Sequence, residues 1–408
     1  MKCRHCQTPL TRTFADLGSA PPSNAYLAPA ALKAPERWYP LHVMVCDKCF
    51  LVQTEDFAAF DQLFDENYAY FSSYSKSWLD HAERYVGDMV QRFVLGPGSV
   101  VAEIAANDGY LLQFVKARGI DCYGVEPTAS TAAAARDIGI DIVEAFFGRA
   151  LGDRLSAEGR SADLIAANNV LAHVPDINDF VSGFSALLKS DGVATFEFPH
   201  LAELIRHNQF DTIYHEHFSY LSLGTVERIF RLNGLAVFDV EKLATHGGSL
   251  RVFAQRADSG SHDETGAVAS LKSEEQAMKL DQVEGYRGFQ KRTEKAKDDF
   301  LRFLINQHSE GRPVAAYGAA AKGNTFLNYA GVRGDLISFV VDRNPEKQGK
   351  FMPGSRIPIV EEARLKQDRP EFIVILPWNL ADEISDQLSY ARDWGAKFVR
   401  AIPEVKVW

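Results

Sequence analysis

Four side chains that can exchange protons stand in a row at Tyr214, His215, Glu216 and His217. Imidazole has the ordinary pKa closest to neutrality, so a histidine at this place could remove a proton from a substrate at pH 7. On a strand, Tyr214 and Glu216 would face one way and the two histidines the other, whereas a loop or a helix start would let several of the four converge. The four residues alone are equally compatible with a surface patch and with a general-base site.

A second cluster consists of the pairs Cys3-x-x-Cys6 and Cys46-x-x-Cys49. Two such pairs supply four thiolates, which fill the tetrahedral shell of zinc and leave no open position for a substrate. Disulfide bonds are disfavoured in a reducing cytosol, which favours a metal over two unrelated thiol pairs. We therefore predict a structural Zn²⁺ that supplies much of the stability of a small N-terminal domain.

A nucleotide-type loop is predicted after the apolar strand that begins near Ser99. The strand runs into small residues and then a helix, and a second strand ends in an acid at Glu126. Such an acid can hydrogen-bond ribose hydroxyls, and small residues let a ligand approach the backbone. The loop reads E-x-x-x-N-D-G instead of G-x-G-x-x-G, which favours S-adenosylmethionine (SAM) over a dinucleotide. The residues that we expect at the cofactor are Glu103, Ala105, Asn107, Asp108, Gly109, Glu126, Phe147, Asn168 and Asn169.

The position of the Tyr214–His217 segment along the chain favours a functional site. Asn168, Asn169 and His173 lie at the carboxyl end of a buried strand, where open α/β sheets bind ligands. The segment follows the next strand, which ends near Pro199. We therefore expect the proton-transferring residues on the ligand-binding side of the sheet.

A second α/β unit is predicted from Arg312 onward. A strand runs into small residues and a helix that begins near Lys322, and helix-start amides together with an ammonium suit a phosphate. A purely structural lobe is the alternative interpretation. The residues that we expect at the substrate are Lys322, Asn324, Asp342, Lys347, Trp378 and Asn379 from this unit, with His246, Gly247, Gly248 and Arg251 from a preceding turn.

Length and charge limit the class of protein. A chain of 408 residues predicts two or three domains, and its net charge of −10 argues against nucleic acid or an anionic membrane as a partner. No run approaches the ~20 apolar residues that span a bilayer, and the start of the chain lacks the apolar core of a signal peptide. We expect a cytoplasmic protein with a small-molecule partner; the sequence does not define the oligomeric state, and a monomer is compatible with it.

Several motifs in the same order resemble those of the SAM-dependent C-methyltransferases that act on nucleotide-linked 4-keto-6-deoxy sugars. They are the paired Cys-x-x-Cys, E-x-x-x-N-D-G, N-x-x-x-H-x-P, Y-x-E-H, H-G-G-x-x-R, G-A-x-A-K and P-W-N, and they span nearly the whole chain. The resemblance implies an α/β chain with a zinc-binding domain (residues 1–70), a class I methyltransferase domain of Rossmann type (71–270) and a C-terminal Rossmann-like domain that holds the nucleotide sugar (271–408). The family pattern has Gly where this chain has Ala105.

The resemblance implies base chemistry for the last histidine of Y-x-E-H, which is His217, and gives no role to His215. A carbon beside a ketone becomes a nucleophile when a base removes its proton and the enolate oxygen is stabilised. We expect His217 to be the base, Glu216 to orient its ring, and Tyr214 and His173 to face the keto oxygen. The expected site of methylation is C-3′. Tyr70 would line the same cavity.

Three alternatives remain at this level. His173, His215 and His217 could form a catalytic metal site. The methyl acceptor could be oxygen or nitrogen, which needs a base but no ketone. The chain could also be a binding protein that keeps the fold without activity.

Overall fold

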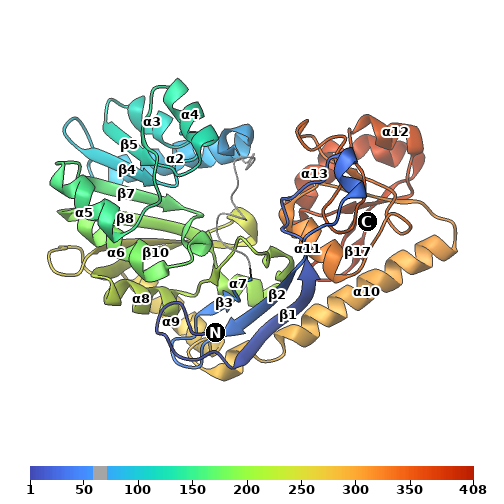
Figure 1. Cartoon of the computed structure of the whole chain (residues 1–408), viewed down its shortest axis with the longest axis horizontal. Helices are drawn as coiled ribbons and strands as arrows, with labels where there is room; N and C mark the ends of the chain where they lie inside the picture. Colours follow the sequence, from blue (N-terminus) through green and yellow to red (C-terminus); the bar gives the residue numbers. More distant parts are fainter. Residues whose placement is uncertain (58–70) are drawn as a thin grey trace.

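The computed structural model describes residues 1–57 and 71–408. Figure 1 shows two lobes, one built on the middle of the chain and one on its C-terminal part. The N-terminal strand β1 (Arg12–Ala20) and the long helix α10 (Phe289–Ser309) run along the lower edge of this view and connect the two lobes. In the described residues, no helix is long and apolar enough to cross a membrane.

The first sheet joins the N-terminal region to the middle of the chain. Its strands are β1, β2 (Tyr39–Val45), β3 (Val52–Thr54) and β9 (Ser219–Tyr220), which pair antiparallel in that order. Val52 of β3 lies opposite Tyr220 of β9. Because β9 begins just after His217, this sheet fixes the end of the Tyr214–His217 segment.

The second sheet has seven strands in the order β10-β11-β8-β7-β4-β5-β6. The five strands from β8 to β6 pair parallel, and β11 and β10 add antiparallel at one edge. The middle of β7, residues 164–167, is a continuous apolar run because helices cover both faces of the sheet. The strands are β4 (Val100–Ile104), β5 (Asp121–Val125), β6 (Asp141–Val143), β7 (Ala162–Asn168), β8 (Leu188–Pro199), β10 (Leu235–Leu243) and β11 (Ser249–Arg256).

Helices on the two faces of this sheet form two separate cores. α2, α3 and α4 pack on one face, and α5, α6 and α8 on the other. The helices are α2 (Lys76–Arg92), α3 (Leu112–Lys116), α4 (Ala129–Asp137), α5 (Arg149–Ala157), α6 (Ile177–Leu187), α7 (Leu201–Arg206), α8 (Leu223–Leu232) and α9 (Gly266–Ala277). Short 3-10 helices lie at Ser72–Tyr74, Leu171–His173, Phe210–Thr212 and Thr245–Gly247.

The third sheet forms the C-terminal lobe, in the order β14-β13-β12-β15-β16-β17, and all its pairs except β16–β17 are parallel. Loops after β12 and β15 flank the point at which the strand order reverses, where open α/β sheets bind ligands. The elements are β12 (Val314–Tyr317), α11 (Ala321–Tyr329), β13 (Val340–Val341), β14 (Ile359–Val360), α12 (Ala363–Asp368), β15 (Phe372–Ile375), α13 (Ala381–Gln387), β16 (Lys397–Arg400) and β17 (Lys406–Val407). Further 3-10 helices lie at Pro29–Lys33, Val283–Tyr286, Trp378–Leu380 and Ser389–Trp394.

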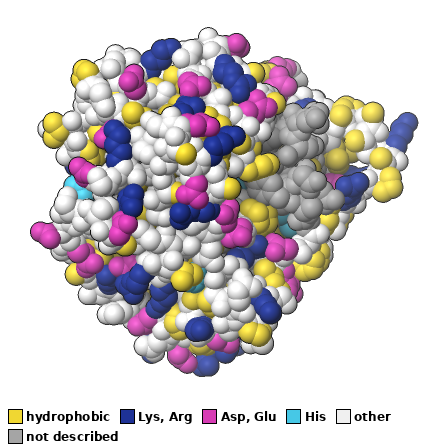
Figure 2. All heavy atoms as spheres, turned by 60° about the vertical axis from the view of Figure 1, so that its left-hand side comes forward, with side chains coloured by type: hydrophobic (Ala, Val, Ile, Leu, Met, Phe, Trp, Pro, Cys, Tyr) yellow, Lys and Arg dark blue, Asp and Glu magenta, His cyan; other side chains and the backbone are white. Residues whose placement is uncertain are grey.

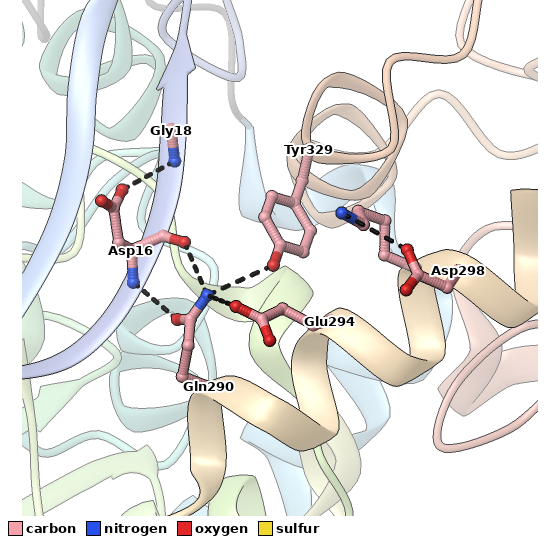
Figure 3. Close-up of a pocket in the computed structure, with 7 residues that line it drawn as sticks. Asp16, Gly18, Gln290, Glu294, Asp298 and Tyr329 are labelled. Carbon is pink, nitrogen blue, oxygen red and sulfur yellow. Dashed lines mark hydrogen bonds and ion pairs between the residues drawn. The ribbon is translucent and has the colours of Figure 1, made fainter.

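β1 and α10 meet along a seam that contains a hollow of about 370 Å³ (Figure 3). Phe14 stacks on Phe289 in the packed part of the seam, with ring centroids 4.4 Å apart. At the hollow, the Gln290 side chain accepts from the Asp16 amide at 2.8 Å and donates to the Asp16 carbonyl and to Glu294. These groups hydrogen-bond to one another, so we interpret the hollow as part of the packing between β1 and α10.

The structure confirms the predicted α/β fold class, with a four-cysteine cluster at the N-terminus and a central Rossmann-like sheet. The predicted domain boundaries at 70 and 270 stay a prediction, because β9 pairs with the N-terminal sheet. On the face in Figure 2, Lys and Arg side chains intermingle with Asp and Glu, and no basic stripe crosses that face.

Candidate active site

The predicted cofactor loop is a tight turn at the carboxyl ends of β4 and β5. Ala105, Asn107 and Gly109 have φ values of 61°, 50° and 78°, in the left-handed region. Glu126 accepts hydrogen bonds from the amides of Asn107 at 2.9 Å and Thr128 at 2.8 Å. Glu126, which follows β5, therefore holds the loop that follows β4.

Several buried polar atoms beside this loop make no hydrogen bond of ordinary geometry among the described residues, although the Tyr110 hydroxyl lies near Glu103 and Asn168. They are both carboxylate oxygens of Glu103, both polar atoms of the Asn168 side chain, and Oδ1 of Asp108. Burial also raises the pKa of Glu103 well above its ordinary value. Since buried polar groups are nearly always paired, these atoms indicate a polar ligand at this edge of the sheet. SAM, with its ammonium, sulfonium and ribose hydroxyls, fits this set of acceptors and amides.

The structure does not support the prediction that Phe147 contacts the cofactor. Its ring packs edge-on against Phe180 and Phe184, with centroids 5.8 Å and 5.1 Å away, in the core between α5 and α6. The neighbouring Phe146 is 66% exposed. Asn169 directly follows β7, with a φ of 54°, and its amide donates to the Glu197 carbonyl at 2.7 Å.

Because Ala105 adopts left-handed backbone geometry, its methyl group carries a conformational cost that glycine avoids. Ala105→Gly is expected to raise the free energy of unfolding by about 1 kcal/mol, measured by urea denaturation. The matched control is Ala106→Gly, at a buried neighbour whose φ is not positive. The control should destabilise the protein, and equal effects of the two changes would contradict the prediction.

His217 lies in the loop before β9, with its ring fixed on one side. Its Nδ1 is 2.9 Å from the Thr212 carbonyl oxygen, and its ring centroid is 4.0 Å from that of Tyr214 and 4.6 Å from that of His173. A carbonyl can only accept, so Nδ1 carries the proton and Nε2 keeps its lone pair. Burial first, and then the nearby His173, His246 and Lys322, hold the pKa of His217 well below its ordinary value.

The other two members of the segment face away from this ring. Nε2 of His215 lies 3.3 Å from the Tyr39 carbonyl, on the β2 side. Glu216 accepts from the Asn24 side chain at 3.3 Å, and its other carboxylate oxygen is buried without a partner among the described residues. The expectation that Glu216 orients His217 is therefore wrong in its geometry, because the Thr212 carbonyl occupies that position. Burial raises the pKa of Glu216 to about 7.

His173 reaches the same place from the 3-10 helix after β7. Its segment is tied to the histidine loop by the Phe218 amide, which donates to the Ala172 carbonyl at 2.8 Å. Burial lowers the pKa of His173 to about 4, so the ring is neutral at pH 7. Tyr70, expected to line this cavity, lies outside the described residues.

The C-terminal lobe contributes Lys322, Trp378 and Asn379 next to the histidines. The Lys322 ammonium donates to Asn379 Oδ1 at 2.7 Å and lies 4.7 Å from the Trp378 ring centroid. The Trp378 indole N–H donates to Asp211 Oδ2 at 2.7 Å, across the two lobes. A Cβ on Gly247 would lie 2.4 Å from the Trp378 ring, so only glycine allows this approach.

The turn that contains His246 lies on the same side of the site. His246 has a φ of 57°, and its ring centroid is 5.3 Å from that of Trp78, whose ring also stacks on His81. Gly248 is among the residues that we expect at the substrate, and its amide donates to the Thr245 carbonyl at 2.9 Å within the turn.

Two predicted substrate contacts are structural instead. Arg251 is buried in a double ion pair, with Nε 2.8 Å from Glu197 Oε1 and Nη1 2.7 Å from Glu241. Asn324 is buried under the N-terminal segment and donates to the Ser23 carbonyl at 2.5 Å. Both side chains are therefore engaged within the protein. The sequence did not reveal this, because the partner of Asn324 and one partner of Arg251 lie far away in the chain.

Asp342 and Lys347 organise the loop after β12. Asp342 accepts from the amides of Ala319 and Asn344, each at 2.8 Å. Lys347 donates to the Ala319 carbonyl at 2.8 Å. Asp342 thus repeats in the C-terminal lobe what Glu126 does in the middle lobe.

The four predicted zinc ligands come together at the N-terminus. Their sulfur atoms all lie within 4.8 Å of one another, and the pairs Cys3–Cys49 and Cys6–Cys46 are each 3.5 Å apart. A tetrahedral Zn–S₄ site with bonds of 2.3 Å has sulfur–sulfur edges of about 3.8 Å. The donor set fits one structural Zn²⁺.

Three family models match the chain in succession: a zinc binding domain (residues 3–64), a methyltransferase domain (78–240) and a C-methyltransferase C-terminal domain (244–403). The C-methyltransferase NovU of Streptomyces niveus is 35% identical over 406 residues, which cover 100% of this chain and 96% of NovU. The chain belongs to this C-methyltransferase family. It is a methyltransferase that uses SAM, forms a carbon–methyl bond on a small molecule and carries a structural zinc site.

Similar solved structures cover parts of this C-methyltransferase. Magnesium protoporphyrin IX methyltransferase from Synechocystis PCC 6803, with bound SAM, is 16% identical, with a TM-score of 0.34 over 44% of this chain and 79% of that one. A SAM-dependent methyltransferase from Mesorhizobium loti is 16% identical, with a TM-score of 0.35 over 44% of this chain and all of that one. The family assignment rests on the full-length relative.

Two members of the site were absent from the sequence predictions. The Thr212 carbonyl is a backbone group, for which no side-chain signal exists. Asp211 had a weak signal, an acid between Phe210 and Thr212-Ile213 in an otherwise buried stretch. Its partner Trp378 is too distant in sequence for spacing to pair them.

Proposed function

We propose that this C-methyltransferase methylates C-3′ of a nucleotide-linked 4-keto-6-deoxy sugar, with His217 as the base. The observation that carries the proposal is the His217 ring, whose Nδ1 is engaged by Thr212 while Nε2 keeps its lone pair beside Tyr214 and His173. A neutral imidazole in this environment can accept a proton from a carbon acid at pH 7. The sequence motifs support the sugar class, and the name of the relative NovU supports C-methylation.

In the proposed reaction, Nε2 of His217 removes the proton from the carbon beside the ketone. The C–H electron pair moves into the enolate, whose oxygen Tyr214 and His173 would stabilise by hydrogen bonds. The loop at 103–109 and Glu126 would hold SAM, which would supply an electrophilic methyl group for the enolate carbon, the methyl–sulfur electron pair leaving on the neutral thioether of the cofactor product. His217 then releases its proton to water, which restores the neutral ring.

Lys322 and Lys347 would bind the diphosphate of the nucleotide. Lys322 lies in the first turn of α11, so it would offer its ammonium near the helix-start amides in the C-terminal lobe. Trp378 and Asn379 flank it, and the His246-Gly247-Gly248 turn faces it from the other lobe. We also propose that the domains span residues 1–70, 71–270 and 271–408. We also propose a cytoplasmic location, which suits four zinc-bound thiolates.

The test is incubation of the protein with SAM and a panel of nucleotide 4-keto sugars. A product that gains the mass of one methylene and shows a C-methyl signal by NMR at C-3′ supports the proposal. An O-methyl or N-methyl signal would show that oxygen or nitrogen is the methyl acceptor and would contradict C-methylation of the sugar. If no sugar gains mass, the proposed substrate class is wrong.

The pH dependence of kcat/KM gives a further prediction. His217 must be neutral to act, and its pKa is held well below 6.5 by burial and by His173, His246 and Lys322. Activity should therefore persist as the pH falls below 6.5 and decline only when the lowered pKa is reached. Glu216, with a pKa of about 7, titrates in the same range, so Glu216→Gln is the control variant. An acid limb at or above pH 6.5 in that variant would contradict the prediction.

A further inference from the structure

Three consecutive residues before the histidine loop receive contacts that converge on one short turn. Asp211 accepts the indole N–H of Trp378 at 2.7 Å, and the Ile213 carbonyl accepts the hydroxyl of Thr325 at 2.8 Å. Between them, the Thr212 carbonyl accepts Nδ1–H of His217 at 2.9 Å. Trp378 and Thr325 both belong to the C-terminal lobe, whereas the turn and His217 belong to the middle of the chain. The C-terminal lobe thus holds the backbone on either side of the carbonyl that orients the ring.

The Trp378 ring is confined on several sides, so its N–H has a defined direction. It packs against Gly247, where a side chain would collide with it, and the Lys322 ammonium lies over its face. Asp211 is buried, with 1% of its surface exposed, and its second carboxylate oxygen has no hydrogen-bond partner among the described residues. Loss of the Trp378 donor would leave the buried Asp211 carboxylate less well paired, and the high cost of burying an unpaired acceptor favours movement of this residue.

The turn is also fixed from within its own lobe. The Thr212 hydroxyl donates to the Gln209 carbonyl at 2.7 Å, and the Gln209 side chain donates to the Gly247 carbonyl at 2.7 Å. The same glycine that contacts Trp378 is therefore tied to the start of the turn. These contacts form a closed ring of interactions around the backbone that positions His217.

We propose that Asp211 and Trp378 are positioning residues, and that their hydrogen bond across the two lobes sets the orientation and tautomer of His217 through the Thr212 carbonyl. The inference rests on the proposed role of His217 as the base. The bond keeps the Thr212 carbonyl directed at Nδ1, and this leaves the lone pair on Nε2. When the bond is lost, the turn relaxes, and the proton can reside on either nitrogen.

Two readouts test this inference. NMR of isotope-labelled histidine reports the tautomer of His217 in the full-length protein without substrate, with the signal assigned by its absence in His217→Asn. Steady-state turnover on the active 4-keto sugar reports kcat and KM. The variants are Trp378→Phe, which keeps the ring but removes the donor, Asp211→Ala, which removes the acceptor, and Asp211→Asn, which keeps a carbonyl oxygen that can accept the indole N–H.

Trp394→Phe is the matched control. Its indole N–H donates to the Pro370 carbonyl at 3.1 Å, within the C-terminal lobe and away from His217. This change removes a bond of the same kind, so it should leave the His217 tautomer and kcat as in the wild type. A shift of the His217 signal in this control would show that general loosening of the lobe explains the effect.

We expect Trp378→Phe and Asp211→Ala to give a mixture of His217 tautomers and to lower kcat by about 10-fold to 100-fold, with KM for SAM unchanged. Asp211→Asn should restore both readouts. If Trp378→Phe and Asp211→Ala keep the wild-type tautomer, the inference is overturned. It is also overturned if Asp211→Asn is as impaired as Asp211→Ala, because the negative charge beside Lys322 would then be the cause. If His217→Asn itself turns over normally, the proposed function fails, whatever the tautomer of His217 does.

Discussion

Replacement of His217 by asparagine is expected to lower kcat for methyl transfer by about 10²–10⁴-fold, the usual contribution of a general base. The asparagine amide can still donate to the Thr212 carbonyl, so the turn keeps a hydrogen bond that His217 makes at 2.9 Å. What disappears is the lone pair on Nε2. The affinity for SAM, measured by calorimetry, should stay unchanged because the cofactor loop at 103–109 belongs to a different segment.

His215→Asn is the matched control for this prediction. His215 is as buried as His217 and two residues away in the chain, but its ring faces the Tyr39 carbonyl on the β2 side. Turnover close to that of the wild type is expected. Equal losses in the two variants would show that the segment is merely sensitive to substitution, and normal turnover by His217→Asn would remove this residue from the chemistry.

Loss of the zinc site is expected to have the largest effect on stability. Zinc binding to four thiolates supplies about 10–16 kcal/mol in small zinc domains, which is comparable with the whole stability of a typical protein. Cys46→Ser should reduce the bound zinc, measured by mass spectrometry, and lower the free energy of unfolding by more than about 5 kcal/mol. Cys46 directly follows β2, and both Cys46 and Cys49 lie in the connection from β2 to β3, so the first sheet should lose its order with the metal.

The fifth cysteine provides the control for this effect. Cys122 lies on β5 outside the cluster, and Cys122→Ser should keep both the zinc content and most of the stability. Because β3 pairs with β9 next to His217, loss of zinc should also reduce turnover even though the metal lies outside the catalytic cluster. A zinc-free protein with normal stability would contradict the structural role of the site.

Patterns between residues close in the chain were sufficient for much of this protein. The Cys-x-x-Cys pairs predicted the metal cluster, because the spacing within each pair brings two thiolates to one ion. The alternation of apolar strands, small residues and helices predicted the α/β fold and the edge where ligands bind. The acids Glu126 and Asp342 were found at strand ends, where each holds the loop after the preceding strand.

The tertiary structure decided which partner each polar group takes. We predicted Arg251 and Asn324 as substrate contacts. In the structure, Arg251 pairs with Glu197, and Asn324 donates to the Ser23 carbonyl. Glu216 stands beside His217 in the chain and faces Asn24 instead.

The proton-transferring segment shows the same division. Its composition alone was equally compatible with a surface patch and with a base, and the position of the segment after a strand of the sheet favoured the base. The sequence distinguished His217 from His215 only through the resemblance to a family. The orientation of His217 depends on a backbone carbonyl, and that carbonyl lies between two contacts from a lobe more than a hundred residues later in the chain. Periodicity and spacing describe how a segment folds against its immediate neighbours, whereas such contacts arise only when packing brings distant segments together.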